Sequence, residues 1–262
     1  MLAVCVALFA GCADPSPPPS PACTTLFGAP NGRTGLGAEQ CRPVCTCGAT
    51  PFVPRAWTAG SLAALRSLTD LAPPTGLTAD PYAQPAPSPP PAETVCAARF
   101  AASSGYRMET FASAAAARAA GAIVSHGSAC GVCSSLTDLA VYAGTPDLTA
   151  PVRTCGVLHG DSLDALVTCL AGLGFTRPCA QVWAYNTLHT RARCLDTCAA
   201  LLAAPYHLPD GSLNACLACD EAQSGAVFKA VAGRTRRNSG LANAMCRPCD
   251  EVLRLDHAYP GT

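Results

Sequence analysis

The sequence predicts an α+β fold that is mostly helical and rich in disulfides. Three observations predict it: 18 cysteines among 262 residues, several segments with apolar residues at helical spacing, and one short strand–helix–strand pattern. Half of the residues are hydrophobic but only 6% are aromatic, so a core built on alanine and leucine buries little apolar area per residue. Cross-links offset that weakness. We therefore expect a small cysteine-rich N-terminal module followed by a larger, mainly helical domain.

The first residues indicate export. Residues 1–12, MLAVCVALFAGC, form an apolar run that is too short to span a bilayer and is typical of a signal peptide. The segment LFAGC resembles the bacterial lipobox, which implies that Cys12 is acylated after cleavage. Residues 13–22 then form a proline-rich spacer that would hold a folded part away from a surface. We expect an extracytoplasmic protein, either a cell-envelope lipoprotein that meets the membrane only through its lipid or a plainly secreted protein.

The cysteine count predicts complete pairing. Once Cys5 and Cys12 are set aside, 16 cysteines remain, and an even number in an oxidising compartment predicts about eight disulfides. A proline-rich linker at 73–93 divides them, because prolines cannot donate to a helix or sheet. Residues 23–72 hold four cysteines, enough for two bridges within a small module. Residues 94–262 hold the other twelve, within the larger domain.

Elements of the larger domain follow from periodicity and caps. A strand at 106–111, an alanine-rich helix ending at Gly121 and a strand at 122–126 form its start. Helices are then expected from Ser134 or Ser135, from Asp161 as N-cap, after Pro178 up to Pro205, and from Ser212, with an earlier short helix from Ser61. The pairs Cys194 with Cys198 and Cys216 with Cys219 have helical spacing, so each pair should join one helix face to other elements.

Three CxxC motifs raise the question of a metal site. They lie at 130–133, 216–219 and 246–249, and the last two have a spacing that would suit a four-thiolate zinc site in a reducing compartment. Export favours disulfides over metal capture. We therefore expect neither a metal nor another cofactor.

The segment HGSACGVCSSL, residues 126–136, is the sharpest candidate for chemistry. Cys133 precedes a predicted helix, where a low-pKa thiolate could act as a redox pair with Cys130. The five residues CGVCS also resemble the CGSCW segment of papain-like proteases, which implies that Cys133 would be a nucleophile and that a histidine such as His126 or His189 would be its base. Ser134 stands where that family has tryptophan. We expect instead that both cysteines pair, each with a more distant cysteine such as Cys155, Cys169 or Cys179.

The charges suggest a possible ligand. The formal net charge is zero, which argues against nucleic acid as a partner. One basic cluster stands out, and its arginines could bind an anionic small molecule or an envelope component: Lys229, Arg234, Arg236 and Arg237. Two functions are therefore open. The first is a non-catalytic binding or structural module held by disulfides, and the second is an extracytoplasmic enzyme with a cysteine–histidine site.

Overall fold

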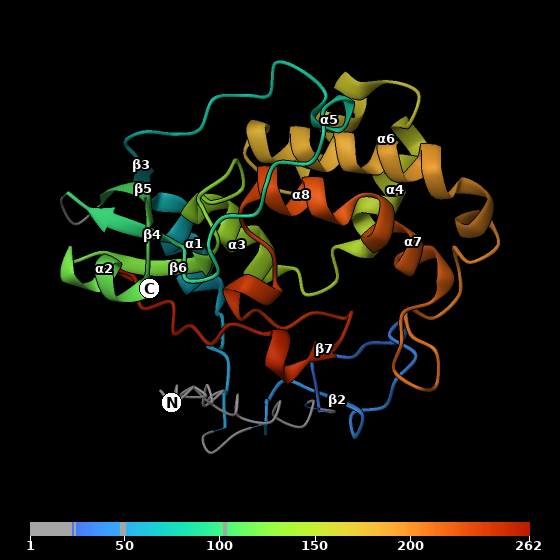
Figure 1. Cartoon of the computed structure of the whole chain (residues 1–262), viewed down its shortest axis with the longest axis horizontal. Helices are drawn as coiled ribbons and strands as arrows, with labels where there is room; N and C mark the ends of the chain where they lie inside the picture. The colour runs from blue at the N-terminus through green and yellow to red at the C-terminus, as the bar shows by residue number, and fades with distance from the viewer. Residues whose placement is uncertain (1–22, 24, 48–50, 102–103) are drawn as a thin grey trace, which may run out of the picture.

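The structure is a computed structural model that describes residues 23, 25–47, 51–101 and 104–262. The signal-peptide segment, the spacer and Cys12 lie outside the described residues. Figure 1 places a sheet and its covering helices at one side of the molecule and the helices α4 to α8 at the other. The predicted class is confirmed, because the fold combines helices with short strands and contains eight disulfides among the described residues.

A four-stranded sheet has the order β3–β5–β4–β6. Its strands are β3 (Thr69–Asp70), β4 (Val95–Phe100), β5 (Gly105–Phe111) and β6 (Ile123–Gly127). β4 pairs antiparallel with both β5 and β6, so the predicted strand–helix–strand start has β4 inserted between its two strands. Side chains alternate across the sheet. Val95 and Ala97 pack towards α2 (Ala114–Ala119), whereas Ala98 and Tyr106 face the main core.

The main core lies between the sheet and the helices. Its helices are α1 (Ala59–Ser67), α3 (Leu136–Gly144), α4 (Thr149–His159), α5 (Leu163–Gly172) and α6 (Arg177–Ala199). Leu166, Val167 and Leu170 of α5 are buried at the i, i+1 and i+4 spacing of one helix face. They pack with Leu139 of α3 and Val182 of α6 in the same cluster.

Helix starts follow the capping residues. Ser135 caps α3, and its hydroxyl accepts the Asp138 N–H at 3.0 Å, as predicted for one of the two serines. The prediction that Asp161 caps α5 is wrong by one residue, because Ser162 accepts the Ala165 N–H. The helix predicted from Ser212 is α7 (Ala215–Gln223), with Asn214 as its cap. It is followed directly by α8 (Gly225–Ala232).

The N-terminal segment is joined to the C-terminal segment. β1 (Leu26–Phe27) pairs in parallel with β2 (Cys41–Arg42) and antiparallel with β7 (Arg247–Pro248). Two disulfides join the same segments, Cys41–Cys246 and Cys45–Cys249. The expectation that the four cysteines of residues 23–72 pair among themselves is therefore wrong for two of them, and only Cys23–Cys47 is internal. Local spacing could not reveal these bridges, because each joins residues more than 200 positions apart.

The remaining five disulfides lie within residues 94–262, as predicted: Cys96–Cys130, Cys133–Cys179, Cys155–Cys169, Cys194–Cys219 and Cys198–Cys216. The last two join α6 to α7 through the cysteine pairs that share a helix face. All 16 cysteines from Cys23 onward are thus paired, which confirms the predicted number of bridges. Within the described part of the chain, no helix is both long and apolar enough to cross a membrane.

The proline-rich segment has two different parts. Residues 84–89 and 91–93 are exposed. By contrast, the preceding turn η1 (Pro81–Ala83) packs on α6, where the Tyr82 hydroxyl donates to the Asn186 side chain at 2.7 Å. The Leu77 N–H also donates to Gln181 of α6 at 2.8 Å. The first half of residues 73–93 therefore belongs to the folded body.

Candidate functional site

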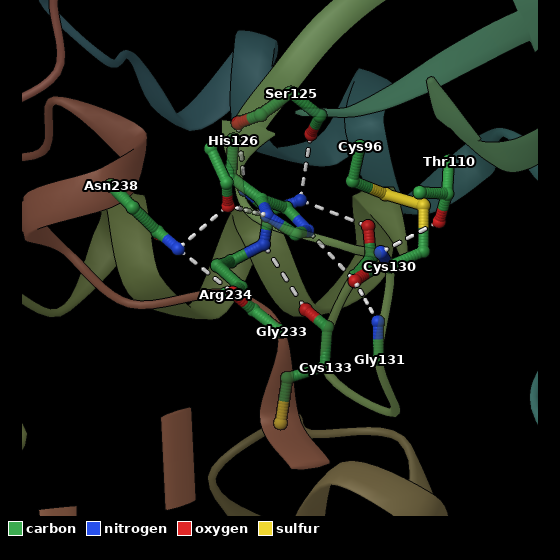
Figure 2. The surroundings of a disulfide bond; sticks show 12 residues. Cys96, Thr110, Ser125, His126, Cys130, Gly131, Cys133, Gly233, Arg234 and Asn238 are labelled. Carbon is green, nitrogen blue, oxygen red and sulfur yellow. Dashed lines mark hydrogen bonds between the residues drawn. A yellow bond between two sulfur atoms is a disulfide. The ribbon is translucent and has the colours of Figure 1, made fainter. Parts of the chain in front are cut away.

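The segment 126–136 is a cross-linked turn between β6 and α3. Cys130 is bonded to Cys96 of β4 (Figure 2). Cys133 is bonded to Cys179 at the start of α6. The prediction that each pairs with a more distant cysteine is confirmed. Because both sulfurs are in disulfides, neither is a thiolate and the two do not form a redox pair with each other.

The histidines proposed as bases have other partners. His126 is fully buried, and its Nδ1–H donates to the Gly127 carbonyl while its Nε2 accepts the Ser134 hydroxyl, both at 2.7 Å. Burial and then the charge of Arg234 lower the pKa of His126, so its ring stays neutral. His189 lies ten residues beyond Cys179 on α6, about 15 Å along the helix. It contacts Ser224 at 3.0 Å, and its ring stacks on Tyr82.

Arg234 is an internal cross-brace of this turn. Its side chain is fully buried, and it donates to the carbonyls of Ser125, Cys133 and Ser134 and to the hydroxyls of Ser125 and Ser239 (Figure 2). Five hydrogen bonds to internal acceptors leave this guanidinium no free face for a ligand. Of the predicted basic cluster, Arg234 therefore serves the fold.

A cavity lies among the helices. Its volume is about 220 Å³, and its walls come from α3, α4, α6, α7, α8 and the segment 235–247. Apolar and aromatic side chains form its body: Tyr142, Leu148, Val152, Trp183, Leu217 and Phe228. Trp183 packs edge-on to Phe228 with ring centroids 4.8 Å apart, and its indole N–H donates to the Tyr142 hydroxyl at 3.1 Å.

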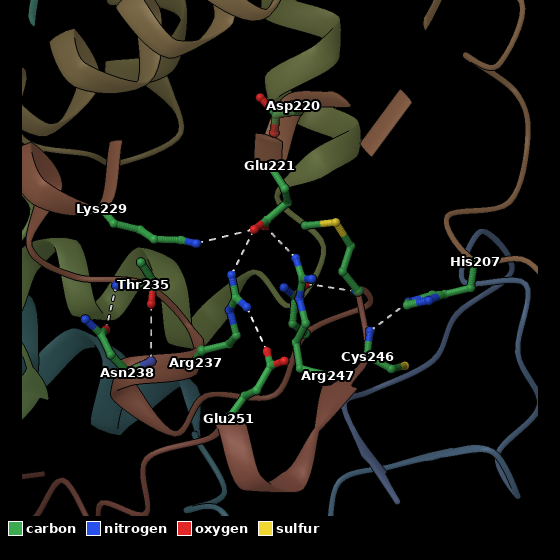
Figure 3. Close-up of polar contacts among 12 residues, drawn as sticks. His207, Asp220, Glu221, Lys229, Thr235, Arg237, Asn238, Cys246, Arg247 and Glu251 are labelled. Atoms are coloured by element: carbon green, nitrogen blue, oxygen red, sulfur yellow. Dashed lines mark hydrogen bonds and ion pairs between the residues drawn. The ribbon is translucent and has the colours of Figure 1, made fainter. Parts of the chain in front are cut away.

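A cluster of charged side chains lines one end of the cavity. The Glu221 carboxylate of α7 forms ion pairs with three cations: Arg247 at 2.6 Å, Arg237 at 2.9 Å and Lys229 at 3.4 Å (Figure 3). Arg237 also contacts Glu251 at 2.8 Å. Burial raises the pKa of Glu221, but the three cations outweigh burial and hold it below its usual value. The carboxylate thus stays ionised and holds the cluster together.

The cavity has an excess of positive charge. Five cationic residues line it, namely Arg153, Lys229, Arg236, Arg237 and Arg247, against the two acids Asp220 and Glu221. Burial raises the pKa of Asp220, although its hydrogen bond from Thr190 opposes this. The excess is notable in a chain whose formal net charge is zero. An excess of cations around a cavity favours an anionic ligand.

Lys229, Arg236 and Arg237 of the predicted cluster thus meet at one cavity, together with three residues that the sequence analysis did not single out, Arg153, Glu221 and Arg247. The Arg236 guanidinium donates to the carbonyls of Tyr142 and Thr145, so Arg236 contributes positive charge to the site and not a direct hydrogen bond. Arg153 was missed because α4 was not predicted, and Arg247 because it lies inside a CxxC motif. No local spacing singles out Glu221, because it lies on α7 and its partner Lys229 on α8.

The CxxC motifs do not form a zinc site. Cys216 and Cys219 are bonded to α6, whereas Cys246 and Cys249 are bonded to the N-terminal segment. Within the described residues, the sulfurs of Cys23, Cys47 and Cys249 lie within 4.8 Å of one another. Because they belong to two disulfides, they are not thiolate ligands.

Residues 163–255 match a family of unknown function, DUF8771. The match spans α5 to α8 and the segment that carries Arg237 and Arg247, so it covers most of the charged end of the cavity. It does not reach Tyr142 or Arg153. Comparison with curated proteins and with solved structures gave no match. The eight disulfides are typical of proteins in an oxidising, extracytoplasmic environment.

Proposed function

We propose that this is an extracytoplasmic protein, held at the cell envelope by a lipid on Cys12, that binds a small apolar acid in the cavity between α4, α6, α7 and α8. Its role is binding and not catalysis. The observation that carries the proposal is the pairing of an aromatic cavity body with an excess of cations at its wall. Small-molecule sites commonly combine an apolar enclosure with a few placed polar groups.

The apolar body determines what kind of ligand fits. Trp183, Phe228 and Tyr142 present aromatic surface from three different helices. An acid without an apolar part would leave that surface in contact with water, and an apolar molecule without an acid would leave the cations unmatched. A ligand with both an apolar part and an acid group matches both the aromatic residues and the cations of the cavity.

Disulfides fix the helices that form the cavity. Cys155–Cys169 joins α4 to α5, and Cys194–Cys219 and Cys198–Cys216 join α6 to α7. The cavity walls are thus held in place before a ligand arrives. Preorganisation raises affinity because less conformational freedom is lost on binding.

A pair of variants on one helix tests the proposal. Val152 lines the cavity and is 8% exposed, whereas Val157 of the same helix is 66% exposed. We expect isothermal titration with 3-phenylpropionate to show one saturable site in the wild type. Val152→Trp should weaken binding at least tenfold by filling the cavity, and Val157→Trp should not.

Folding of both variants is checked by circular dichroism and thermal melting. Absence of binding by 3-phenylpropionate, indole-3-acetate and 4-phenylbutyrate in the folded wild type would contradict the proposal. Equal weakening by both tryptophan substitutions would also contradict it, because the acid would then bind elsewhere.

A further inference from the structure

Among the cations of the cavity, Arg153 differs from the rest in its partners. Lys229, Arg237 and Arg247 share the Glu221 carboxylate. The Arg236 guanidinium donates to backbone carbonyls. Within the described part of the chain, Arg153 makes no ion pair with a carboxylate.

The immediate surroundings of Arg153 do not satisfy it. Its Nη2 lies 3.5 Å from the Cys216 sulfur, which is a weak acceptor. Its guanidinium carbon lies 5.7 Å from the centroid of the Tyr206 ring. Its Nη1 is buried and has no hydrogen-bond partner among the described residues. Buried charged donors in folded proteins normally have an acceptor. Because Arg153 also lines the cavity, a ligand there could supply the acceptor once the guanidinium turns to meet it.

We propose that Arg153 binds the acid group of the ligand and that the ligand is an aromatic monocarboxylate. This inference rests on the proposed function of the cavity. A single guanidinium without an acid partner fits one carboxylate, whereas a doubly charged phosphate would be better matched by two such cations. Of the other four cations, three share the Glu221 carboxylate and Arg236 donates to carbonyls.

The aromatic part of the ligand follows from the aromatic residues that line the same cavity. Trp183 and Phe228 both line the cavity and pack edge to face with each other, and a ring of the ligand could join this aromatic pair. Arg153 on α4 and these rings on α6 and α8 line the same cavity. A carboxylate and a ring joined by a short linker can therefore reach both.

An isosteric pair of probes isolates the charge. 3-Phenylpropionate and 3-phenylpropanamide have nearly the same shape, and only the first is an anion. We expect the wild type to bind the acid about 10- to 100-fold more tightly than the amide, the usual range for a charge-assisted hydrogen bond. Arg153→Met should reduce this preference to about threefold or less while leaving the amide affinity within a factor of three.

Two further variants complete the test. Arg193→Met removes the same charge from an exposed position of α6 outside the cavity, and it should keep the wild-type preference. Arg153→Lys retains a cation but not the planar fork, so its preference should fall between those of the wild type and Arg153→Met. It also serves as the test if Arg153→Met fails to fold.

The outcomes separate this inference from the proposed function. If the wild type binds the acid and Arg153→Met, or Arg153→Lys in its place, keeps the full preference for acid over amide, the assignment of Arg153 is overturned while the binding function stands. If the wild type binds neither probe, both are overturned. A loss of preference in Arg193→Met equal to that in Arg153→Met would also overturn the assignment, because net charge alone would then explain it.

Discussion

Removing the two disulfides between residues 41–45 and 246–249 together should destabilise the protein by more than the sum of removing each. Cys41–Cys246 and Cys45–Cys249 run side by side, with sequence separations of 205 and 204 residues. When one bridge is removed, the other still closes the long loop. The first removal therefore opens only the small ring of roughly eight residues between the two bridges, and closing that ring is worth ~2.5 kcal/mol in the chain-entropy treatment.

The second removal opens the long loop itself. Cys96–Cys130, Cys133–Cys179 and Cys194–Cys219 shorten that loop by spanning 34, 46 and 25 residues. An effective loop of roughly 100 residues remains, which is worth about 4.7 kcal/mol. Losing both bridges should thus cost ~7 kcal/mol, against ~5 kcal/mol for the two single losses added together. The coupling is ~2 kcal/mol, well above the scatter of additive sites.

Guanidinium unfolding of four proteins measures this coupling: wild type, Cys41→Ala with Cys246→Ala, Cys45→Ala with Cys249→Ala, and all four substitutions. Alanine avoids burying a hydroxyl, since all four positions are buried. The cost of the lost sulfur contacts cancels in the cycle, so only the loop closure is compared. Additivity within about 0.5 kcal/mol would refute the reasoning and would indicate that the two segments are held together without these bridges.

Three further predictions concern pH, backbone packing and attachment. Burial lowers the pKa of His257 to about 4. The stability due to its neutral ring is therefore complete above the unfolded pKa of about 6.5 and is lost as the pH falls towards 4, and chemical unfolding should show a loss of ~3 kcal/mol over that range. A His257→Gln variant with the same pH profile as the wild type would contradict this. A Cβ on Gly131 would overlap the Val231 carbonyl, so Gly131→Ala should cost about 1 to 3 kcal/mol in thermal unfolding, whereas Gly172→Ala, with open space around it, should be neutral; equal effects would argue against the close backbone approach. Cys12→Ser should move the protein from the membrane fraction to the soluble fraction of a bacterial host, and unchanged fractionation would eliminate the lipid anchor.

Much of the helical layer could be predicted, because its signals are local. Periodicity and a serine cap identify α3, and the long pattern after Pro178 identifies α6. The sequence does not predict α4, because Pro151 argues against a helix there. Pro151 lies in the first turn of α4, where the backbone N–H has no intrahelical acceptor and its absence loses no hydrogen bond. β4 was not predicted either, because its apolar residues alternate between two buried faces and two small alanines weaken the pattern.

The candidate site could be predicted only in part. Lys229 and Arg237 stand out in the sequence as members of a basic cluster, and the structure places them at the cavity. The pairing of Arg237 and Arg247 on Glu221 depends on tertiary packing, as does the burial of Arg234 behind the 126–136 turn. The even number of cysteines predicts how many disulfides form but not which cysteines pair, since the pairing depends on which elements meet in the fold.

The central claim, that the cavity binds an apolar acid, is tested most directly by the two tryptophans of the chain. Trp183 lines the cavity, whereas Trp57 lies beside His257 with ring centroids 5.8 Å apart and does not line it. Titration with 3-phenylpropionate should change the emission of Trp183 in a Trp57→Phe variant, saturably and with the affinity found by calorimetry. The emission of Trp57 in a Trp183→Phe variant should stay constant. No saturable change at Trp183, or an equal change at Trp57, would contradict the account.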